Sequence, residues 1–328
     1  MLIRKHEPNR LSEKDVTSEE VYRSRRSFLR NAALGLGGVG LAAGLKGPVS
    51  AALWGREALP SGTAPRDKSL PPLKAARNAK YTVPGRKISP ESVVGGYNNY
   101  YEFLTDKRRV AEHAANFRTR PWQIEVKGLV EKPLKFDVDD LLKEFPLEER
   151  IYRHRCVEAW SIVVPWSGFP MAKFVAWAKP TAKANYVRMV SFYRPEQCIG
   201  QREQAWYKWP YYEALRMDEA MNELAFLVVG SYGHILPNQN GSPLRLATPW
   251  KYGYKSIKGI TTFEFTEKQP HTFWNDLAPA EYDFLSNVNP AKPHPRWSQA
   301  SEIEVATGQR IPTLPFNGYG GFISGLYR

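Results

Sequence analysis

Alternation of apolar and polar residues predicts strands in several parts of the chain. The run Trp122-Gln123-Ile124-Glu125-Val126 alternates before a glycine, so residues 122–130 are predicted to form a half-buried strand followed by a turn. Further strands are predicted over residues 186–193, 225–229 and 259–266. Asp137 precedes the run 138–145 and is expected to cap a short helix. Short helices between strands indicate a mixed α/β fold.

The first 51 residues are predicted to be an export leader. Ser24-Arg25-Arg26-Ser27-Phe28-Leu29-Arg30 is a paired-arginine motif, and the apolar stretch 32–45 that follows contains five glycines. A membrane-spanning helix needs roughly 20 predominantly apolar residues, so this stretch is too short. The small residues Val49-Ser50-Ala51 predict cleavage after Ala51. We expect the twin-arginine translocase to carry the chain, folded and loaded with any cofactor, into the periplasm.

The remaining residues are predicted to form one large domain behind an extended segment. Residues 52–90 are rich in proline and basic residues without periodicity, and residues 91–328 are long enough for a single catalytic domain. No G-x-G-x-x-G or Walker loop appears, which argues against ordinary nucleotide enzymes. No later run is long and apolar enough to cross a bilayer, so we expect a soluble mature chain.

The expected mature chain carries a net positive charge. Of 46 Lys and Arg, nine lie in the leader, and of 33 Asp and Glu, five do, which leaves 37 against 28 and a net charge of +9. Such a balance favours an anionic cofactor, membrane surface or nucleic acid. The basic residues are dispersed and no nucleic-acid-binding motif is present, so a nucleic-acid partner is not expected.

Cysteine is sparse, and Cys156 is the candidate metal ligand. Only Cys156 and Cys198 are present, so an exported protein that depends on disulfides is not indicated, although one disulfide between them is an alternative. Arg153 and Arg155 flank Cys156 and are expected to favour its thiolate, which suits a transition metal. Only His154 lies nearby, so a protein-only zinc site is not predicted. Cys198 is expected to be an inert thiol.

Several motifs together carry a family resemblance. They are Tyr97-Asn98-Asn99-Tyr100-Tyr101-Glu102-Phe103, Arg155-Cys156-Val157-Glu158-Ala159-Trp160, Trp166-Ser167-Gly168-Phe169-Pro170, Pro195-Glu196-Gln197, Pro237-Asn238-Gln239-Asn240-Gly241, Pro243-Leu244-Arg245-Leu246, the run 249–258, Asn289-Pro290 and the run 294–300. The cysteine segment resembles the molybdenum-binding segment of the sulfite-oxidase fold family. As a set, the motifs are similar to the catalytic subunits of protein-methionine-sulfoxide reductases over nearly all of residues 90–328.

The resemblance implies a sulfite-oxidase-type molybdopterin-binding fold with one Mo-molybdopterin per chain and Cys156 on the molybdenum. It also implies that a set of residues contacts the molybdopterin: Asn98, Tyr101, Glu102, Ser191, Asn240, Arg245, Ser256, Ile257 and Lys258. Ser191 stands where the family has threonine but keeps the hydroxyl. Arg245 and Lys258 suit the terminal phosphate. Glu158 is either a catalytic proton donor near the metal or a structural carboxylate.

The function implied by the resemblance is reduction of methionine sulfoxide residues in oxidised periplasmic proteins. The resemblance also implies that electrons come from the quinone pool through a haem-b membrane subunit. The chain has no C-x-x-C-H motif, so a haem of its own is not expected. A sulfite oxidase or a reductase of small S- or N-oxides on the same fold is the alternative enzyme. A binding protein that lacks the cofactor and buries Cys156 is the alternative from another class.

Overall fold

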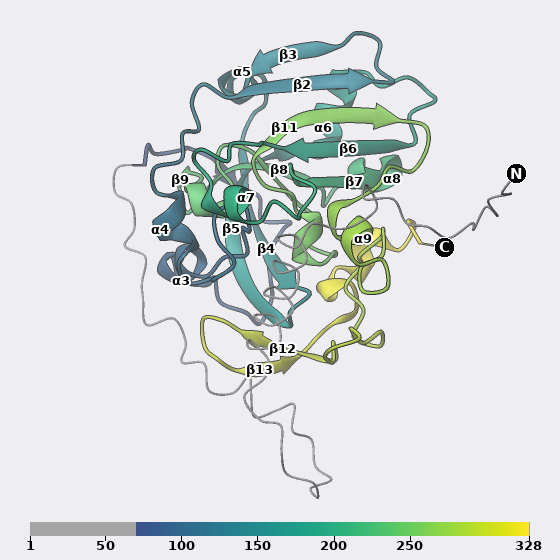
Figure 1. Ribbon diagram of the computed structural model, residues 1–328. Coiled ribbons are helices and arrows are strands. Elements are labelled where there is room, and N and C mark those ends of the chain that lie inside the picture. Colours follow the sequence, from purple (N-terminus) through teal and green to yellow (C-terminus); the bar gives the residue numbers. More distant parts are fainter. Residues whose placement is uncertain (1–69, 328) are drawn as a thin grey trace, which may run out of the picture. The chain divides into compact units, whose positions relative to one another are not determined.

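The computed structural model describes residues 70–327, so the predicted leader with Arg25 and Arg26 lies outside the described residues. One sheet contains β3 (Leu134–Asp137), β2 (Gln123–Gly128), β11 (Ile260–Thr266), β6 (Tyr186–Ser191) and β7 (Tyr212–Arg216), in that order (Figure 1). β11 and β2 are parallel, and the other neighbours are antiparallel. The strands predicted over 122–130, 186–193 and 259–266 are therefore confirmed.

A second sheet carries the residues around Cys156. Its path is β1 (Ala76–Arg77), β4 (Glu148–Cys156), β5 (Trp160–Pro170), β12 (Ser301–Glu304) and β13 (Arg310–Pro312), while β8 (Phe226–Ser231) pairs with β5, β9 (His234–Ile235) and β10 (Arg245–Ala247). β8 confirms the strand predicted over 225–229. The hairpin β4–β5 has no alternating pattern to predict it, because almost every residue of β5 is buried.

Short helices connect these strands. They are α3 (Glu91–Gly96), α4 (Val110–Ala114), α5 (Val138–Glu144), α6 (Met171–Ala178), α7 (Ile199–Glu203), α8 (Met217–Ala220), α9 (Phe273–Leu277) and α10 (Gly320–Ile323), with 3-10 turns η2 (Asn238–Asn240), η3 (Gly253–Lys255) and η4 (Pro315–Gly318). The cap of α5 is as predicted: Asp137 accepts a hydrogen bond from the Asp139 backbone at 3.0 Å, and Asp140 accepts one from the Asp137 backbone at 3.2 Å. The structure confirms the mixed α/β class.

One continuous core joins the two sheets. On α6, the Phe174 ring packs 4.3 Å from Phe263 of β11, and Phe145 stacks 4.5 Å from Phe169 of β5. These residues belong to one cluster of buried side chains that includes members of both sheets. The described part of the extended segment 52–90 runs along this domain: Ala76 pairs in parallel with Glu148 at the start of β4. The two sheets thus share one main core, and a second, smaller cluster contains Tyr207, Tyr212 and Phe273.

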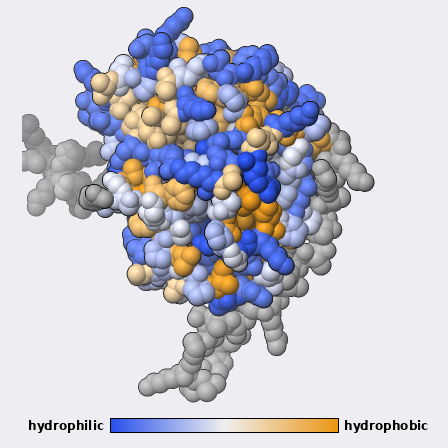
Figure 2. All heavy atoms as spheres, turned by 180° about the vertical axis from the view of Figure 1, so that it is seen from behind, coloured by the Kyte–Doolittle hydropathy of each residue, from blue (hydrophilic) through white to orange (hydrophobic). Residues whose placement is uncertain are grey.

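The face of the molecule drawn in Figure 2 is mostly hydrophilic. On the face drawn in Figure 2, hydrophobic residues form small groups between hydrophilic ones. Within residues 70–327, no helix has both the length and the apolar character needed to cross a membrane.

Candidate active site

A cavity opens where three segments of the chain meet. Its empty space is about 1010 Å³, counted with the solvent in its open mouth. Residues 97–102, the turn between β4 and β5, and the segment between Asn240 and Lys258 contribute most of its walls, and Trp209, Tyr211, Phe273, Trp274 and Tyr282 complete it. Residues remote in sequence therefore converge on one concave site.

Cys156 lies in this cavity at the end of β4. Its side chain is buried, and Sγ accepts a hydrogen bond from the Asn99 side-chain amide at 3.3 Å and from the Glu158 backbone at 3.4 Å. Burial raises the pKa of the Cys156 thiol to about 12, and the Glu158 carboxylate adds to the shift. The chain alone thus favours the neutral thiol, and a bound metal cation would supply the charge that stabilises the thiolate.

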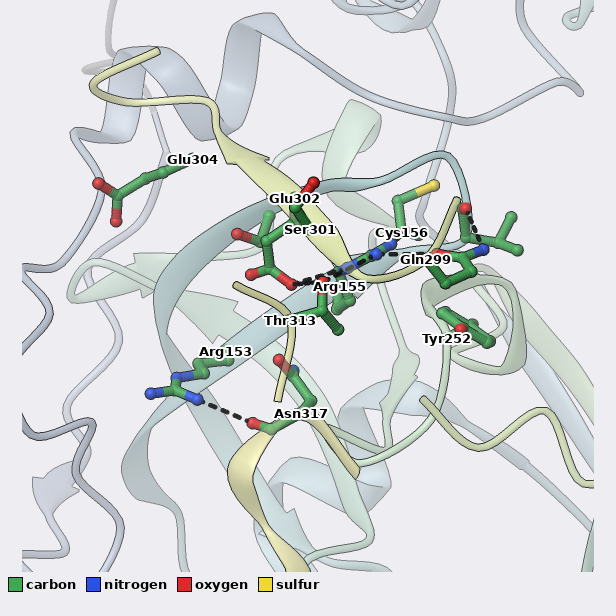
Figure 3. Close-up of polar contacts among 12 residues, drawn as sticks. Arg153, Arg155, Cys156, Tyr252, Gln299, Ser301, Glu302, Glu304, Thr313 and Asn317 are labelled. Carbon is green, nitrogen blue, oxygen red and sulfur yellow. Dashed lines mark hydrogen bonds and ion pairs between the residues drawn. The ribbon is translucent and has the colours of Figure 1, made fainter. Parts of the chain in front are cut away.

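Of the two arginines expected to favour the thiolate, Arg155 does lower the pKa of Cys156, but burial and Glu158 outweigh it. Successive residues of a strand point to opposite faces, so His154 and Cys156 face the cavity while Arg153 and Arg155 face away from it. Arg155 pairs with Glu302 at 2.8 Å, and Arg153 donates to the Asn317 carbonyl at 3.1 Å (Figure 3). The two arginines are thus neighbours of Cys156 in sequence, but their side chains lie on the opposite face of the strand.

Glu158 is held as a carboxylate close to the thiol. One of its oxygens lies 3.7 Å from Cys156 Sγ and accepts hydrogen bonds from Asn99 at 2.9 Å and from the Trp160 indole at 3.2 Å. Lys107 forms an ion pair with the same oxygen at 3.2 Å. Burial opposes the charged form, but these partners outweigh it and hold the pKa of Glu158 below its ordinary value. The surroundings favour a positioned carboxylate over a protonated donor.

The structure brings together most of the predicted cofactor residues. Those that line the cavity with Cys156 are Asn98, Tyr101, Glu102, Asn240, Arg245, Ser256, Ile257 and Lys258. Ser191 is the exception: its hydroxyl donates to the Lys258 carbonyl at 2.8 Å, and it is not among the lining residues. Ser191 thus supports the backbone of the cofactor segment, and direct contacts of the other residues with the cofactor stay predictions.

Positive charge gathers at one part of the cavity. Arg245 is buried and Lys258 is partly buried, and among the described residues neither forms an ion pair with a carboxylate. Burial lowers the pKa of Arg245 to about 10; burial, with Arg245 nearby, lowers that of Lys258 to about 7. Glu102 is the buried carboxylate that acts on Lys258, and burial raises its own pKa to about 7. Buried cations without paired anions fit an anionic ligand such as a phosphate.

Unpartnered polar atoms support the same fit. The Asn99 side-chain oxygen and the Tyr100 hydroxyl are buried and have no hydrogen-bond partner. Buried polar groups are normally paired, and a pterin supplies both donors and acceptors along its edge. A sulfur ligand, an excess of buried positive charge and unpaired polar atoms in one cavity fit a molybdopterin, with Cys156 as its ligand to the metal.

Among the cavity residues that were not predicted from sequence, three bear on the thiol and its strand. Asn99 touches both Cys156 and Glu158, and its place in the 97–103 motif was the available signal. His154 lies two positions before Cys156 on the same strand face; burial, with Arg245 and Lys258 nearby, lowers its pKa to about 3, so its ring is neutral. Gly253 leaves room for that ring, because a Cβ there would lie 2.5 Å from His154 Nε2.

Aromatic rings form the wall beside Cys156. Tyr97 meets Trp160 edge-on at 5.1 Å, Trp274 lies 5.7 Å from Tyr101, and Trp274 lies 5.2 Å from Tyr282. All five line the cavity. Such a wall suits an apolar or thioether group better than a small inorganic anion.

Cys198 has no part in this site. It is fully buried, it does not line the cavity, and burial raises its pKa beyond the ordinary range. Both cysteines are free thiols, so the alternative of a disulfide between them is wrong.

Comparison with known proteins identifies the domain. Residues 111–274 match the family model described as the oxidoreductase molybdopterin binding domain, which is half of the chain and includes Cys156. Among solved structures, the sulfane dehydrogenase SoxCD from Paracoccus pantotrophus is similar with a TM-score of 0.44 and 16% identity over 72% of this chain. The match spans 59% of that chain's length. The family match confirms the expected molybdopterin-binding fold, and the chain therefore belongs to the oxidoreductase molybdopterin-binding domain family.

Proposed function

We propose that this chain is a periplasmic reductase that converts methionine sulfoxide residues of oxidised proteins to methionine at a Mo-molybdopterin centre. Cys156 binds the molybdenum, and electrons come from the quinone pool through a haem-b membrane subunit. The observation that carries the proposal is the arrangement around Cys156, where one buried thiol lies beside an ionised carboxylate and an aromatic wall. The resemblance of the 97–103 and 249–258 motifs to the reductase family supports the same substrate.

Different residues of the chain bind the cofactor, position the thiol and the carboxylate, and contact the substrate. When bound, the molybdenum cofactor supplies a two-electron centre that accepts an oxygen atom. Arg245 and Lys258 hold its anionic end, and Cys156 fixes the metal. Asn99 donates to both the Cys156 sulfur and Glu158, so its side chain sets the distance between thiol and carboxylate. The aromatic wall excludes water and holds the apolar part of the methionine side chain.

Apolar surface distinguishes the proposed substrate from sulfite. The Glu158 carboxylate lies 3.7 Å from the Cys156 sulfur, and Lys107 pairs with it at 3.2 Å, so the two charges offset each other and give no net repulsion of an anion. The aromatic rings that line the cavity can pack against the apolar part of a methionine sulfoxide side chain, whereas sulfite has no apolar part to bury there. An organic sulfoxide is therefore favoured over sulfite.

The test uses the full chain matured in its own export pathway and two measurements. Molybdenum analysis is expected to give about one metal per chain, and its complete absence from correctly matured protein would support a cofactor-free binding protein instead. Turnover is then compared on a protein carrying methionine sulfoxide, on a small dialkyl sulfoxide and on sulfite with an electron acceptor. The oxidised protein is expected to give the highest kcat/KM. Faster oxidation of sulfite would overturn the proposed substrate.

A further inference from the structure

Behind Cys156, on the face of β4 opposite the cavity, lies a cluster of buried polar side chains centred on Arg155. Arg155 is fully buried and donates to Glu302 at 2.8 Å, to the Gln299 side-chain oxygen at 2.8 Å and to the Thr313 hydroxyl at 3.1 Å (Figure 3). A guanidinium has five N–H donors in a rigid fork, and this one has a partner in each direction. Its position is therefore fixed from several sides.

The same cluster holds the backbone of the metal-ligand segment. Arg155 donates to the carbonyl oxygen of Cys156. The Gln299 side-chain amide and the Trp297 indole both donate to the Val157 carbonyl, each at 2.8 Å. Two consecutive carbonyls, those of the ligand residue and of its neighbour, are thus tied to side chains. These hydrogen bonds restrict the movement of the Cys156 backbone, and the position of Sγ depends on the position of that backbone.

The partners come from a part of the chain that is distant in sequence. Gln299, Glu302 of β12 and Thr313 lie beyond residue 274, where the match to the family model ends. Glu302 also approaches Arg86 at 3.4 Å, and Arg86 pairs with Glu304 at 2.7 Å. Two arginines and two glutamates alternate in this cluster, so its charge is balanced and it needs no ligand of its own.

We propose that Arg155 and Gln299 are positioning residues, which set the place of the Cys156 sulfur by holding the Cys156 and Val157 carbonyls from the side opposite the cavity. The C-terminal segment 297–313 is then part of the metal site although it does not reach the cavity at Cys156. The inference rests on Cys156 as the metal ligand of the proposed function. Groups that orient a metal ligand commonly change activity by about 10–100-fold when they are removed.

The experiment compares Arg155→Met and Gln299→Leu with wild type as matured holoenzymes. Both variants are expected to retain molybdenum, to lose about 10–100-fold in kcat with little change in KM, and to shift the electron paramagnetic resonance spectrum of the half-reduced molybdenum centre. The spectrum reports the geometry of the sulfur ligand, which a loss of stability alone does not alter. Gln299→Leu removes no charge, so it decides the question if Arg155→Met does not fold.

Arg153→Met is the matched control. Arg153 lies on the same face of the same strand, but its side chain donates to the Asn317 carbonyl and to neither carbonyl of the ligand segment. Its spectrum should superimpose on that of wild type. A wild-type spectrum and wild-type kcat in loaded Gln299→Leu would overturn the inference. A Cys156→Ser variant with an unchanged molybdenum spectrum would instead overturn the ligand assignment, so the two failures are distinct.

Discussion

At the scale of single residues, the two cysteines are both buried but differ in what surrounds them. Cys156 faces a cavity and contacts Asn99 and Glu158, whereas Cys198 is enclosed by core side chains. Replacing Cys156 by Ser should abolish turnover and molybdenum retention, because an alcohol is a poor substitute for a soft thiolate. Cys198→Ser should keep turnover and lose about 1–3 kcal/mol of stability, because it buries a hydroxyl. Metal analysis and denaturant unfolding measure both; the reverse pattern would contradict the assignment.

Lys258 gives a pH dependence to the cofactor-free protein. Burial lowers its pKa from 10.5 to about 7, so between these values the unfolded chain binds a proton that the folded chain does not. The free energy of unfolding should therefore rise with pH from about 7 to 10.5, by at most about 1.4 kcal/mol per pH unit from this group. Lys258→Met should remove that part of the slope in urea titrations of apoprotein. An identical slope in wild type and variant would show that Lys258 does not titrate in this range.

Residue types predicted the chemistry better than the orientation of the side chains. The Cys156 segment, Arg245 and Lys258 were placed at the cofactor site from sequence, and they line one cavity. The effect expected of Arg153 and Arg155 was too large, because strand alternation turns both side chains away from the thiol and burial outweighs the contribution of Arg155. Ser191 supports the Lys258 carbonyl from outside the cavity, a distinction that requires coordinates.

At the scale of elements, buried ion pairs connect the segment 249–258 to neighbouring elements. This segment carries the predicted cofactor residues Ser256, Ile257 and Lys258. Lys251 and Glu219 of α8 are fully buried and lie 2.6 Å apart, and Lys255 lies 2.7 Å from Glu213 of β7. Lysines are usually surface charges, so exposed side chains would be the ordinary expectation for Lys251 and Lys255. The structure excludes this, and both lysines anchor the segment to neighbouring elements.

Lys251→Met should therefore destabilise the protein by about 3–5 kcal/mol, because it leaves Glu219 buried without its cation. Molybdenum content should fall as well, since the anchored segment lines the cavity. Lys292→Met is the matched control: Lys292 pairs with Asp283 at the surface, where such pairs contribute about 0–1 kcal/mol. Chemical denaturation and metal analysis measure the two effects. Equal small losses in both variants would show that the buried pair is not an anchor.

Alternation predicted the strands that have one face toward the core, and it missed the hairpin that carries Cys156. β2, β6 and β11 alternate because each has an exposed or half-exposed face. β5 is buried over nearly its whole length, and β4 contains charged residues whose partners lie far along the chain, such as Glu302 for Arg155. Long-range pairing of this kind leaves no local pattern.

At the scale of the whole molecule, the proposed compartment depends on residues outside the described part of the chain. Replacing Arg25 and Arg26 together by Lys should leave the precursor in the cytoplasm with its cofactor, because the translocase reads the paired arginines and carries folded proteins. Cell fractionation combined with molybdenum analysis of each fraction measures this. Efficient export of the double variant in an unfolded state would contradict the targeting proposal.

The net charge of the mature chain bears on how electrons reach it. Cleavage of the proposed leader after Ala51 would leave 37 Lys and Arg against 28 Asp and Glu, a net charge of +9, and the proposed electron donor is a separate membrane subunit. Electrostatic steering accelerates the association of a basic protein with an acidic or membrane-bound partner. Salt weakens this steering, because the Debye length falls from about 30 Å at an ionic strength of 0.01 M to about 8 Å at physiological ionic strength. Turnover supplied by the membrane subunit should therefore fall as ionic strength rises. Turnover driven by a small uncharged reductant should change much less, because it needs no docking between charged surfaces. An equal response of the two assays to salt would place the effect at the substrate or the cofactor and would remove the case for electrostatic docking.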